Sequence, residues 1–446
     1  MGKYFGTDGI RGQAGEGLTA ETAFRIGRYL GWYFSQNGHQ NIVMGKDTRL
    51  SSDMLEHALA AGIAAEGCDA YLVGWCPTPA ISYIVHTHDF ACGVMISASH
   101  NPFYDNGIKI FSKDGLKMKA EVEDLIEECI DGKVSLPYST GDKIGRVIAY
   151  EQGLEDYISW VMQEFPVDLK GMRLVADTAN GASTVTAERV LTGLGAEVTM
   201  LNNTPDGINI NTHCGSTHPE GMQETVRSGK YDLGLAFDGD ADRMIMAAPD
   251  GELLTGDHVL YICGKYFRDR GELKNSTVVT TVMANLGLFK AMEREGIRLV
   301  STQVGDKYVY EQMVREDDIV GGEQSGHIIF KEHEATGDGL VTALIFLTIM
   351  KDTGKNALTL REGLKIYPQL LVNVRVRDKE EAMNDPEVVK AIEEVNAHLN
   401  GNGRLLVRPS GTEPLVRVMA EAETDEICAQ EVGIIADIVR RKFGTE

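Results

Sequence analysis

The sequence predicts an α/β protein of four domains. Three are similar mixed α/β sandwich domains and the last is a smaller α+β domain, all arranged around a central cleft. One pattern of strands and helices recurs three times along the 446 residues and changes after about Pro368. A chain of this length also corresponds to several ordinary domains. We place the domains at residues 1–152, 153–254, 255–367 and 368–446.

Each of the three passes has the same order of elements. A short apolar strand leads through a polar turn to a helix, a second strand follows, and a third strand enters a loop of polar or glycine residues. The predicted strands are residues 41–44, 70–73 and 92–96 in the first pass, 173–176, 197–201 and 233–237 in the second, and 277–281, 298–301 and 319–320 in the third. Because α/β sheets bind ligands at loops beyond their strand ends, we expect the three loops to face one cleft.

The last domain follows a different pattern. Its strands are predicted at residues 371–376, 404–408 and 415–420, and its helices at residues 380–399 and 425–442. This order is typical of a small α+β unit.

The loop between the last two strands has the composition of an anion-binding turn. Gly411 lets backbone N–H groups approach a ligand, and Ser410 and Thr412 add hydroxyl donors. Arg408 and Arg417 supply guanidinium groups that match a phosphate. Taken alone, however, an arginine-flanked turn is more often an ordinary surface loop.

Composition and charge exclude several classes of partner. The formal net charge of −23 argues against nucleic acid and anionic membranes. The seven cysteines are scattered and lack a CxxC spacing, which fits a reducing compartment. The longest apolar run, residues 340–350, is too short to cross a bilayer, and the first residues lack a signal-peptide pattern. We therefore expect a cytoplasmic protein with no nucleic-acid or membrane partner.

Three carboxylates at alternate positions follow an apolar strand, in the segment Asp238-Gly239-Asp240-Ala241-Asp242. A tight loop can converge them on one hard cation such as Mg²⁺, and packing them together without a cation would be costly. The segment is not an EF-hand, because Arg243 and Pro249 occupy positions that need Gly and Glu. A phosphatase of the haloacid dehalogenase type stays a minor alternative, although Asp242 stands where that class has Thr or Val.

The loop Ile96-Ser97-Ala98-Ser99-His100-Asn101-Pro102 follows the third strand of the first pass. A serine before a histidine in such a turn is a candidate nucleophile or phosphate carrier, although serines also occur in turns for capping alone. The loop lacks the GxSxG frame of acyl hydrolases. The turn at residues 105–109 can return Lys109 to Ser99, where a lysine would act as a cation or proton donor near phosphate.

The third pass ends in the loop Gly321-Gly322-Glu323-Gln324-Ser325-Gly326-His327. Glu323, Ser325 and His327 offer donors and acceptors suited to sugar hydroxyls. A single histidine of this kind is equally often a hydrogen-bonded structural residue.

Together these four loops resemble the α-D-phosphohexomutase superfamily. Its members carry, in this order, a phosphoserine loop, a DGDxDR metal loop, a GExSGH sugar loop and an Arg-Pro-Ser-Gly-Thr-Glu phosphate loop. All four occur here, and the resemblance runs from the segment at residues 5–12 to the last domain. It implies an isomerase, an intramolecular phosphotransferase acting on a small sugar phosphate.

The resemblance also implies roles for the matching residues. Ser99 would carry the phosphate, and one Mg²⁺ per subunit would be held by Asp238, Asp240, Asp242 and a phosphoryl oxygen on Ser99. His100 and Lys109 are expected to take part in catalysis with Ser99. The substrate-binding residues are expected to be Arg11, Arg243, Glu323, Ser325, His327, Arg408, Ser410, Gly411, Thr412 and Arg417.

Within the superfamily, the Ser97-Ala98-Ser99-His100 segment, Gln324 and the opening Tyr4-Phe5-Gly6-Thr7-Asp8-Gly9-Ile10-Arg11-Gly12 resemble the phosphoglucosamine mutase family. This implies interconversion of glucosamine 6-phosphate and glucosamine 1-phosphate through a phosphoserine enzyme and a 1,6-bisphosphate, for amino-sugar and peptidoglycan precursor synthesis. The alternatives are a phosphomannomutase/phosphoglucomutase, which usually has Gly before the serine and Met or Leu in place of Gln324, and a metal-dependent sugar phosphatase. Relatives are often dimers, which makes a homodimer a possible assembly.

Overall fold

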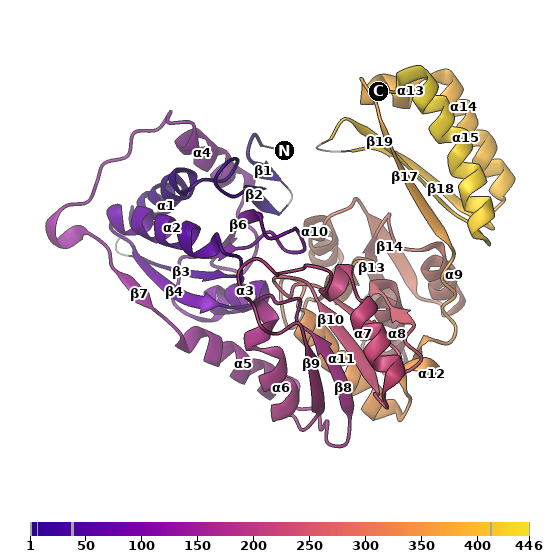
Figure 1. The fold of residues 1–446 in the computed structure, drawn as a ribbon, viewed down its shortest axis with the longest axis horizontal. Coiled ribbons are helices and arrows are strands. Elements are labelled where there is room, and N and C mark those ends of the chain that lie inside the picture. Colours follow the sequence, from indigo (N-terminus) through magenta and orange to yellow (C-terminus); the bar gives the residue numbers. More distant parts are fainter. Residues whose placement is uncertain (1, 7, 37–39, 411–412, 446) are drawn as a thin grey trace. The chain divides into compact units, whose positions relative to one another are not determined.

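The computed structural model describes residues 2–6, 8–36, 40–410 and 413–445. The chain divides into two units, of which the first comprises Met1–Met283 and Ile297–Glu362, and the second Ala284–Gly296 and Gly363–Glu446. The first unit contains three sheets with helices, and the second contains one sheet with helices (Figure 1). The predicted fold class, three α/β domains followed by a smaller α+β domain, is confirmed. The domain boundaries given above stay a proposal.

The three sheets of the first unit share one strand order. In each, the first strand of the pass lies between the second and third strands and is parallel to both, and a fourth strand runs antiparallel to the third. In the first sheet the spatial order of these strands is β4 (Asp69–Trp75), β3 (Asn41–Lys46), β5 (Cys92–Ile96) and β6 (Asp105–Ser112). In the second sheet it is β9 (Glu197–Leu201), β8 (Arg173–Asp177), β10 (Leu233–Phe237) and β11 (Met244–Ala247). In the third sheet it is β14 (Arg298–Thr302), β13 (Thr277–Thr281), β15 (Val320–Gly322) and β16 (Ile328–Phe330). The repeat predicted from the sequence therefore corresponds to three sheets with the same order and direction of strands.

The first sheet is extended at both edges. The amino-terminal hairpin of β1 (Phe5–Gly6) and β2 (Gly9–Gln13) pairs antiparallel with β6, and β7 (Val147–Ala149) pairs parallel with β4. The helices are α1 (Ala20–Ser35), α2 (Ser52–Ala65), α3 (Thr78–Thr87) and α4 (Ala120–Ile130). Apolar side chains of α1, α2 and α4 form one core with alternate residues of β3, β5 and β6, as expected for a strand with two buried faces.

The other elements of the first unit are mostly helices, and one of them contains the longest apolar run of the sequence. The apolar run at residues 340–350 forms most of helix α11 and is buried in the protein core. The remaining elements are β12 (Leu253–Leu254), α5 (Gln152–Glu164), α6 (Ala187–Gly193), α7 (Glu220–Ser228), α8 (Gly256–Asp269), α10 (Asp306–Glu316), α11 (Gly339–Thr353), α12 (Ala357–Arg361) and four 3₁₀ turns at 141–143, 182–185, 215–217 and 274–276. Among the helices that the structure describes, none has the length and apolar character needed to cross a membrane.

The second unit is a three-stranded antiparallel sheet packed against helices. Its strand order is β17 (Gln369–Arg375), β19 (Leu415–Glu421) and β18 (Arg404–Pro409), and its helices are α9 (Leu286–Arg294), α13 (Lys379–Asn384), α14 (Pro386–Leu399) and α15 (Asp425–Phe443). The single helix predicted at residues 380–399 was wrong, because the chain forms α13 and α14 there. Asp385 ends α13 and caps α14 by accepting from the backbone N–H groups of Glu387 and Val388, and Pro386 cannot donate the hydrogen bond that a continuous helix needs.

Close packing of α1 against α2 gives a test of the first core. A Cβ added to Gly62 would collide with the carbonyl oxygen of Phe24. We predict that Gly62→Ala lowers the free energy of unfolding by about 1–3 kcal/mol, the usual cost of overpacking, measured from the midpoint of thermal unfolding. Gly221→Ala is the matched control, because a Cβ on Gly221 in α7 meets no atom within 4 Å. A Gly62→Ala midpoint as high as that of the control would contradict this packing.

Candidate active site

The third strands of the first two sheets both end at one cluster of polar side chains. Ser99 follows β5 in the left-handed backbone region, at φ 53°, and it is completely buried. Its Oγ donates to Oδ2 of Asp238 at 2.6 Å and lies 3.2 Å from Nδ1 of His100. Asp238 follows β10, so the two loops that were singled out separately in the sequence meet at this hydrogen bond.

Asp238, Asp240 and Asp242 lie side by side, as the alternate spacing predicts. All three are buried, and each offers an oxygen within 4.8 Å of the others. Both Asp238 oxygens accept hydrogen bonds, one from Ser99 and one from the backbone N–H of Arg243 at 3.1 Å. Among the residues that the structure describes, no group donates a hydrogen bond to Oδ1 of Asp240 or Oδ1 of Asp242. Buried carboxylate oxygens without donors are what a hard cation takes as ligands, so this set fits a divalent metal ion.

The charges of the cluster support the same conclusion. Burial and the neighbouring carboxylates of Asp242 and Asp240 raise the pKa of Asp238 well above its ordinary value. Burial also acts to raise the pKa of Asp242, but the Lys109 ammonium and His327 outweigh it and hold that pKa low. The loop therefore concentrates negative charge that a cation would neutralise.

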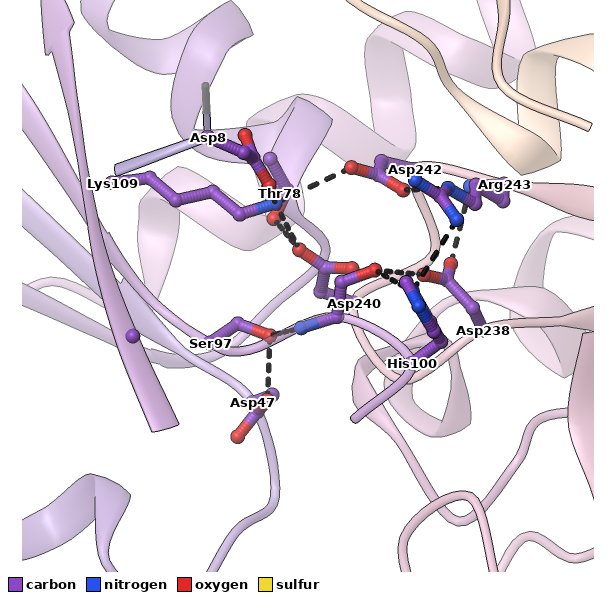
Figure 2. A network of polar contacts seen from close by, with 12 residues as sticks. Asp8, Asp47, Thr78, Ser97, His100, Lys109, Asp238, Asp240, Asp242 and Arg243 are labelled. Atoms are coloured by element: carbon purple, nitrogen blue, oxygen red, sulfur yellow. Dashed lines mark hydrogen bonds and ion pairs between the residues drawn. The ribbon is translucent and has the colours of Figure 1, made fainter. Parts of the chain in front are cut away.

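Lys109 is the main positive charge already in place. It lies on β6, is 2 % exposed, and its Nζ is 2.8 Å from Asp240 Oδ2, 3.3 Å from Asp242 Oδ2 and 3.0 Å from Asp8 Oδ2 (Figure 2). Asp8 also contacts Arg11 at 2.5 Å and Lys117 at 2.8 Å. The amino-terminal segment thus reaches the metal loop through a chain of ion pairs, which joins the predicted residues Arg11 and Lys109.

His100 lies next to the Ser99 hydroxyl, and Arg243 lies next to His100. One guanidinium nitrogen of Arg243 is 3.3 Å from Nδ1 of His100. Burial, together with the positive charges of Arg243 and Arg11, lowers the pKa of His100 to about 4. His100 is therefore neutral at neutral pH, with one ring nitrogen available as a proton acceptor next to the Ser99 hydroxyl.

The Ser99 loop is held by a buried arginine that the sequence analysis did not single out. Arg49 has no exposed side-chain surface, and its guanidinium donates to four backbone carbonyls of this loop. These belong to Ser99, Asn101, Pro102 and Asp105. A planar fork with five N–H groups suits this arrangement, which a lysine could not reproduce.

Asp47 completes that support. It accepts from Nε of Arg49 at 2.8 Å and from the Ser97 hydroxyl at 2.6 Å, and the Ser97 oxygen in turn accepts from the backbone N–H of Ser99 at 2.9 Å (Figure 2). Both the N–H and the carbonyl of Ser99 are thereby tied to Asp47. Such support is what keeps a residue other than glycine at positive φ.

Two buried side chains, one in a loop and one at a helix start, join the Ser99 loop to the metal loop and its neighbours. Asn211 donates its side-chain N–H to the carbonyls of Ser99 at 2.9 Å and Asn101 at 3.1 Å. Thr78, the first residue of α3, donates its hydroxyl to Asp240 Oδ2 at 2.5 Å. Asn211 lies in a loop and Thr78 at a helix start, and both are buried. The sequence carries a signal only for Thr78, because the prolines on both sides of it indicate a helix start.

The predicted sugar loop lies beside the metal loop. Ser325 is exposed and Glu323 half-buried, and Glu323 accepts from the backbone N–H of Gly305 at 3.1 Å. His327 is 3 % exposed, with Nδ1 3.7 Å from Asp242 and Nε2 accepting from the backbone N–H of Gly337 at 3.0 Å. The structure therefore places Glu323 and Ser325 where a ligand can reach them, whereas both His327 nitrogens already have protein partners.

The predicted phosphate loop lies in the second unit. Arg408 on β18 and Arg417 on β19 are directly opposite each other in the antiparallel ladder, so two like charges share one face of the sheet. Burial lowers the pKa of Arg408, and the positive charge of Arg417 lowers it further. Ser410 is buried beside them, while Gly411 and Thr412 lie outside the described residues. Arg417 also forms an ion pair with Glu413 at 3.2 Å, and a bound anion would further stabilise the two neighbouring guanidinium groups.

Comparison with known families matches almost the whole chain. Residues 2–135, 155–251 and 255–367 match alpha/beta/alpha domains I, II and III of the phosphoglucomutase/phosphomannomutase family. Residues 371–438 match the C-terminal domain of that family. The four matches follow the order of the four predicted domains.

Curated relatives align over the full length. The chain is 47 % identical to the phosphoglucosamine mutase of Lachnoclostridium phytofermentans and 49 % identical to that of Lachnospira eligens, in each case over 99 % of both chains. It is 48 % identical to the phosphoglucosamine mutase of Geobacillus thermodenitrificans over 100 % of both chains.

Solved structures share the fold. A phosphoglucomutase/phosphomannomutase family protein from Burkholderia thailandensis superposes with a TM-score of 0.80 at 24 % identity, covering 98 % of this chain and 99 % of that one. The N-acetylphosphoglucosamine mutase of Aspergillus fumigatus, in complex with GlcNAc-6P and magnesium, superposes with a TM-score of 0.71 at 19 % identity, covering 97 % and 95 %.

The support of the Ser99 loop by Arg49 can be tested without assaying turnover. We predict that Arg49→Lys speeds amide hydrogen exchange in the peptide covering residues 97–106, because one ammonium group cannot bind four carbonyls. Exchange followed by mass spectrometry measures this directly. Arg189→Lys is the control, since Arg189 makes only an exposed ion pair with Glu155. Equal exchange in the native protein and both variants would show that Arg49 does not hold the loop.

Proposed function

The chain belongs to the phosphoglucomutase/phosphomannomutase family, with phosphoglucosamine mutases as its full-length relatives, and from this premise we propose that it interconverts glucosamine 6-phosphate and glucosamine 1-phosphate. The enzyme class is that of an isomerase that moves a phosphoryl group within a sugar phosphate. One observation carries the proposal: the Ser99 hydroxyl is 2.6 Å from Asp238, inside the triplet of buried aspartates. A phosphoryl group carried on Ser99 would lie against the metal ligands.

Asp238, Asp240 and Asp242 would hold Mg²⁺, one ion per subunit, with a phosphoryl oxygen on Ser99 as a further ligand. When bound, Mg²⁺ neutralises negative charge on the phosphoryl oxygens during transfer. Lys109 and Arg243 add positive charge from the protein, Lys109 next to Asp240 and Arg243 next to His100. These residues make Ser99 both a good phosphate carrier and a good leaving group.

The reaction proceeds in two balanced transfers. In the first, the bond between phosphorus and the Ser99 oxygen breaks, a bond from phosphorus to the free sugar hydroxyl forms, and the proton of that hydroxyl is released to a base while the Ser99 oxygen gains a proton. The product is glucosamine 1,6-bisphosphate. After the bisphosphate has turned round, Ser99 takes the other phosphoryl group by the reverse chemistry. We assign proton transfer to His100, which lies next to Ser99, and to Lys109, which lies next to Asp240.

The rest of the substrate needs two further sets of contacts. Glu323 and Ser325 would bind ring hydroxyls, His327 would support that loop, and Arg11 and Arg243 would contact the phosphate at Ser99. The phosphate that is not being transferred would be bound in the second unit by Arg408, Ser410, Gly411, Thr412 and Arg417. The cross-strand pair of arginines supports this assignment, because it is a charge repulsion that a phosphate removes.

A metal-dependent sugar phosphatase fits the site less well. Such an enzyme of the aspartyl type needs one carboxylate oxygen free to attack phosphorus. Both oxygens of Asp238, the first aspartate of the loop, accept hydrogen bonds from within the protein.

We also propose a cytoplasmic location, a role in amino-sugar and peptidoglycan precursor synthesis, and a homodimer as a possible assembly, with no nucleic-acid partner. The high negative net charge supports the last point.

Ser99→Ala tests the proposed function directly. We predict complete loss of mutase turnover with glucosamine 6-phosphate binding retained, because the phosphate carrier is gone while the sugar contacts remain. A coupled assay for glucosamine 1-phosphate and isothermal titration measure the two properties. Full activity of Ser99→Ala would reject the proposal, and stoichiometric release of inorganic phosphate by the native protein would favour the phosphatase. Comparing native rates on glucosamine, glucose and mannose phosphates decides the sugar.

Arg417→Gln tests the phosphate loop of the second unit. We predict that KM for the sugar phosphate rises about tenfold or more, because a hydrogen bond to a charged group contributes about 1.5–3 kcal/mol. The variant loses an exposed ion pair with Glu413 as well as the repulsion between Arg408 and Arg417. We therefore expect it to unfold close to the temperature of the native protein. Arg441→Gln on α15, which loses only an exposed ion pair with Glu387, is the control. An unchanged KM in Arg417→Gln would exclude this loop from substrate binding.

A further inference from the structure

Asp240 is held by two residues outside its own loop. Its Oδ2 accepts two hydrogen bonds from the first domain, one from Thr78 Oγ at 2.5 Å and one from Lys109 Nζ at 2.8 Å. Its Oδ1 is buried and accepts none from the described residues. One oxygen is thus fixed by the protein, and the other is left for a ligand.

The two donors to Asp240 differ in charge. The Lys109 ammonium repels a divalent cation that approaches the same carboxylate, and the repulsion is strong at such short range in a buried site. The Thr78 hydroxyl carries no net charge. It can therefore fix the orientation of Asp240 without opposing the cation, and it continues to do so if Lys109 turns toward a phosphate.

The backbone around Thr78 makes this hydroxyl a fixed donor. Thr78 is 2 % exposed and begins α3 between Pro77 and Pro79, and prolines on both sides restrict its backbone. Its own N–H has no partner within the first turn of a helix, and it donates instead to the backbone carbonyl of Asp240 at 2.9 Å. Two hydrogen bonds therefore join this one residue to Asp240, and Figure 2 shows the Thr78 side chain beside Lys109.

We propose that Thr78 is a positioning residue for the metal ion, which it serves by holding Asp240 so that Oδ1 points into the aspartate triplet. The inference rests on the proposed metal site and adds to it a contact from a helix of the first domain. Hydrogen-bond partners of metal ligands commonly contribute 10- to 100-fold to metal affinity. Thr78 would thereby make metal binding depend on the correct packing of α3 against the metal loop.

The test uses Thr78→Val, which keeps the shape of the side chain and removes only the hydroxyl. Binding of Mn²⁺ to the full-length protein, without sugar phosphate, is measured by electron paramagnetic resonance and by isothermal titration. We predict that Thr78→Val binds Mn²⁺ about 10- to 100-fold more weakly than the native protein, and that Thr78→Ser, which retains the hydroxyl, binds close to native. At saturating Mg²⁺ the Thr78→Val enzyme should regain most of its turnover.

Ser82→Ala is the matched control. Ser82 lies one turn further along α3, is buried, and donates its hydroxyl to the carbonyl of Gly115 at 2.7 Å, away from the metal loop. It should bind Mn²⁺ as the native protein does. Native affinity in Thr78→Val, or an equal loss in Ser82→Ala, would overturn the proposal for Thr78. Failure of the native protein itself to bind Mn²⁺ would instead reject the metal site.

Discussion

Mutual repulsion among three buried carboxylates is the constraint on which the rest of the site depends. Asp238, Asp240 and Asp242 are forced together by a tight loop at the end of β10 and are removed from water. Such a group is stable only if positive charge and hydrogen-bond donors surround it. Lys109 and Arg243 supply part of that charge, and the two aspartate oxygens that have no donor among the described residues leave a place for a cation. The same positive charges, from Lys109, Arg243 and a bound cation, would also stabilise a phosphoryl group on Ser99.

The repeated topology explains how the residues of the site come together. In each sheet of the first unit the third strand lies between the first strand and an antiparallel fourth strand, and its carboxyl end carries a polar loop. The loops after β5 and β10 meet at the Ser99–Asp238 hydrogen bond, and the loop after β15 lies close to Arg243, where Gly326 accepts from the backbone N–H of Met244. One arrangement used three times therefore positions the three loops to which we assign the phosphate carrier, the metal ligands and the sugar contacts.

Many strands of the fold and the reactive loops of the site were predictable, because short sequence segments specify them. The strands β5, β9, β10 and β13 begin and end at the predicted residues, since apolar runs bounded by polar turns define them well. The break between α13 and α14 was missed, although Asp385-Pro386 is a strong helix start. Helical periodicity continues across that pair and by itself predicts one continuous helix.

The supporting residues were not predictable in the same way. Arg49, Thr78 and Asn211 act across 50 to 162 positions of sequence, on partners that only the fold brings near them. Nor does the sequence show that Ser99 has positive φ, because local composition does not favour that conformation for serine. The chemistry of the site follows from local motifs, whereas its geometry follows from long-range contacts.

In the proposed reaction, Ser99 carries the phosphoryl group within reach of the aspartate triplet. The most direct test of this step is tandem mass spectrometry of peptides from the protein after incubation with glucosamine 1,6-bisphosphate and Mg²⁺. We expect one added phosphate, located on Ser99, that disappears when excess glucosamine 6-phosphate is supplied. A phosphate that stays on the protein, or one found on a residue other than Ser99, would contradict it.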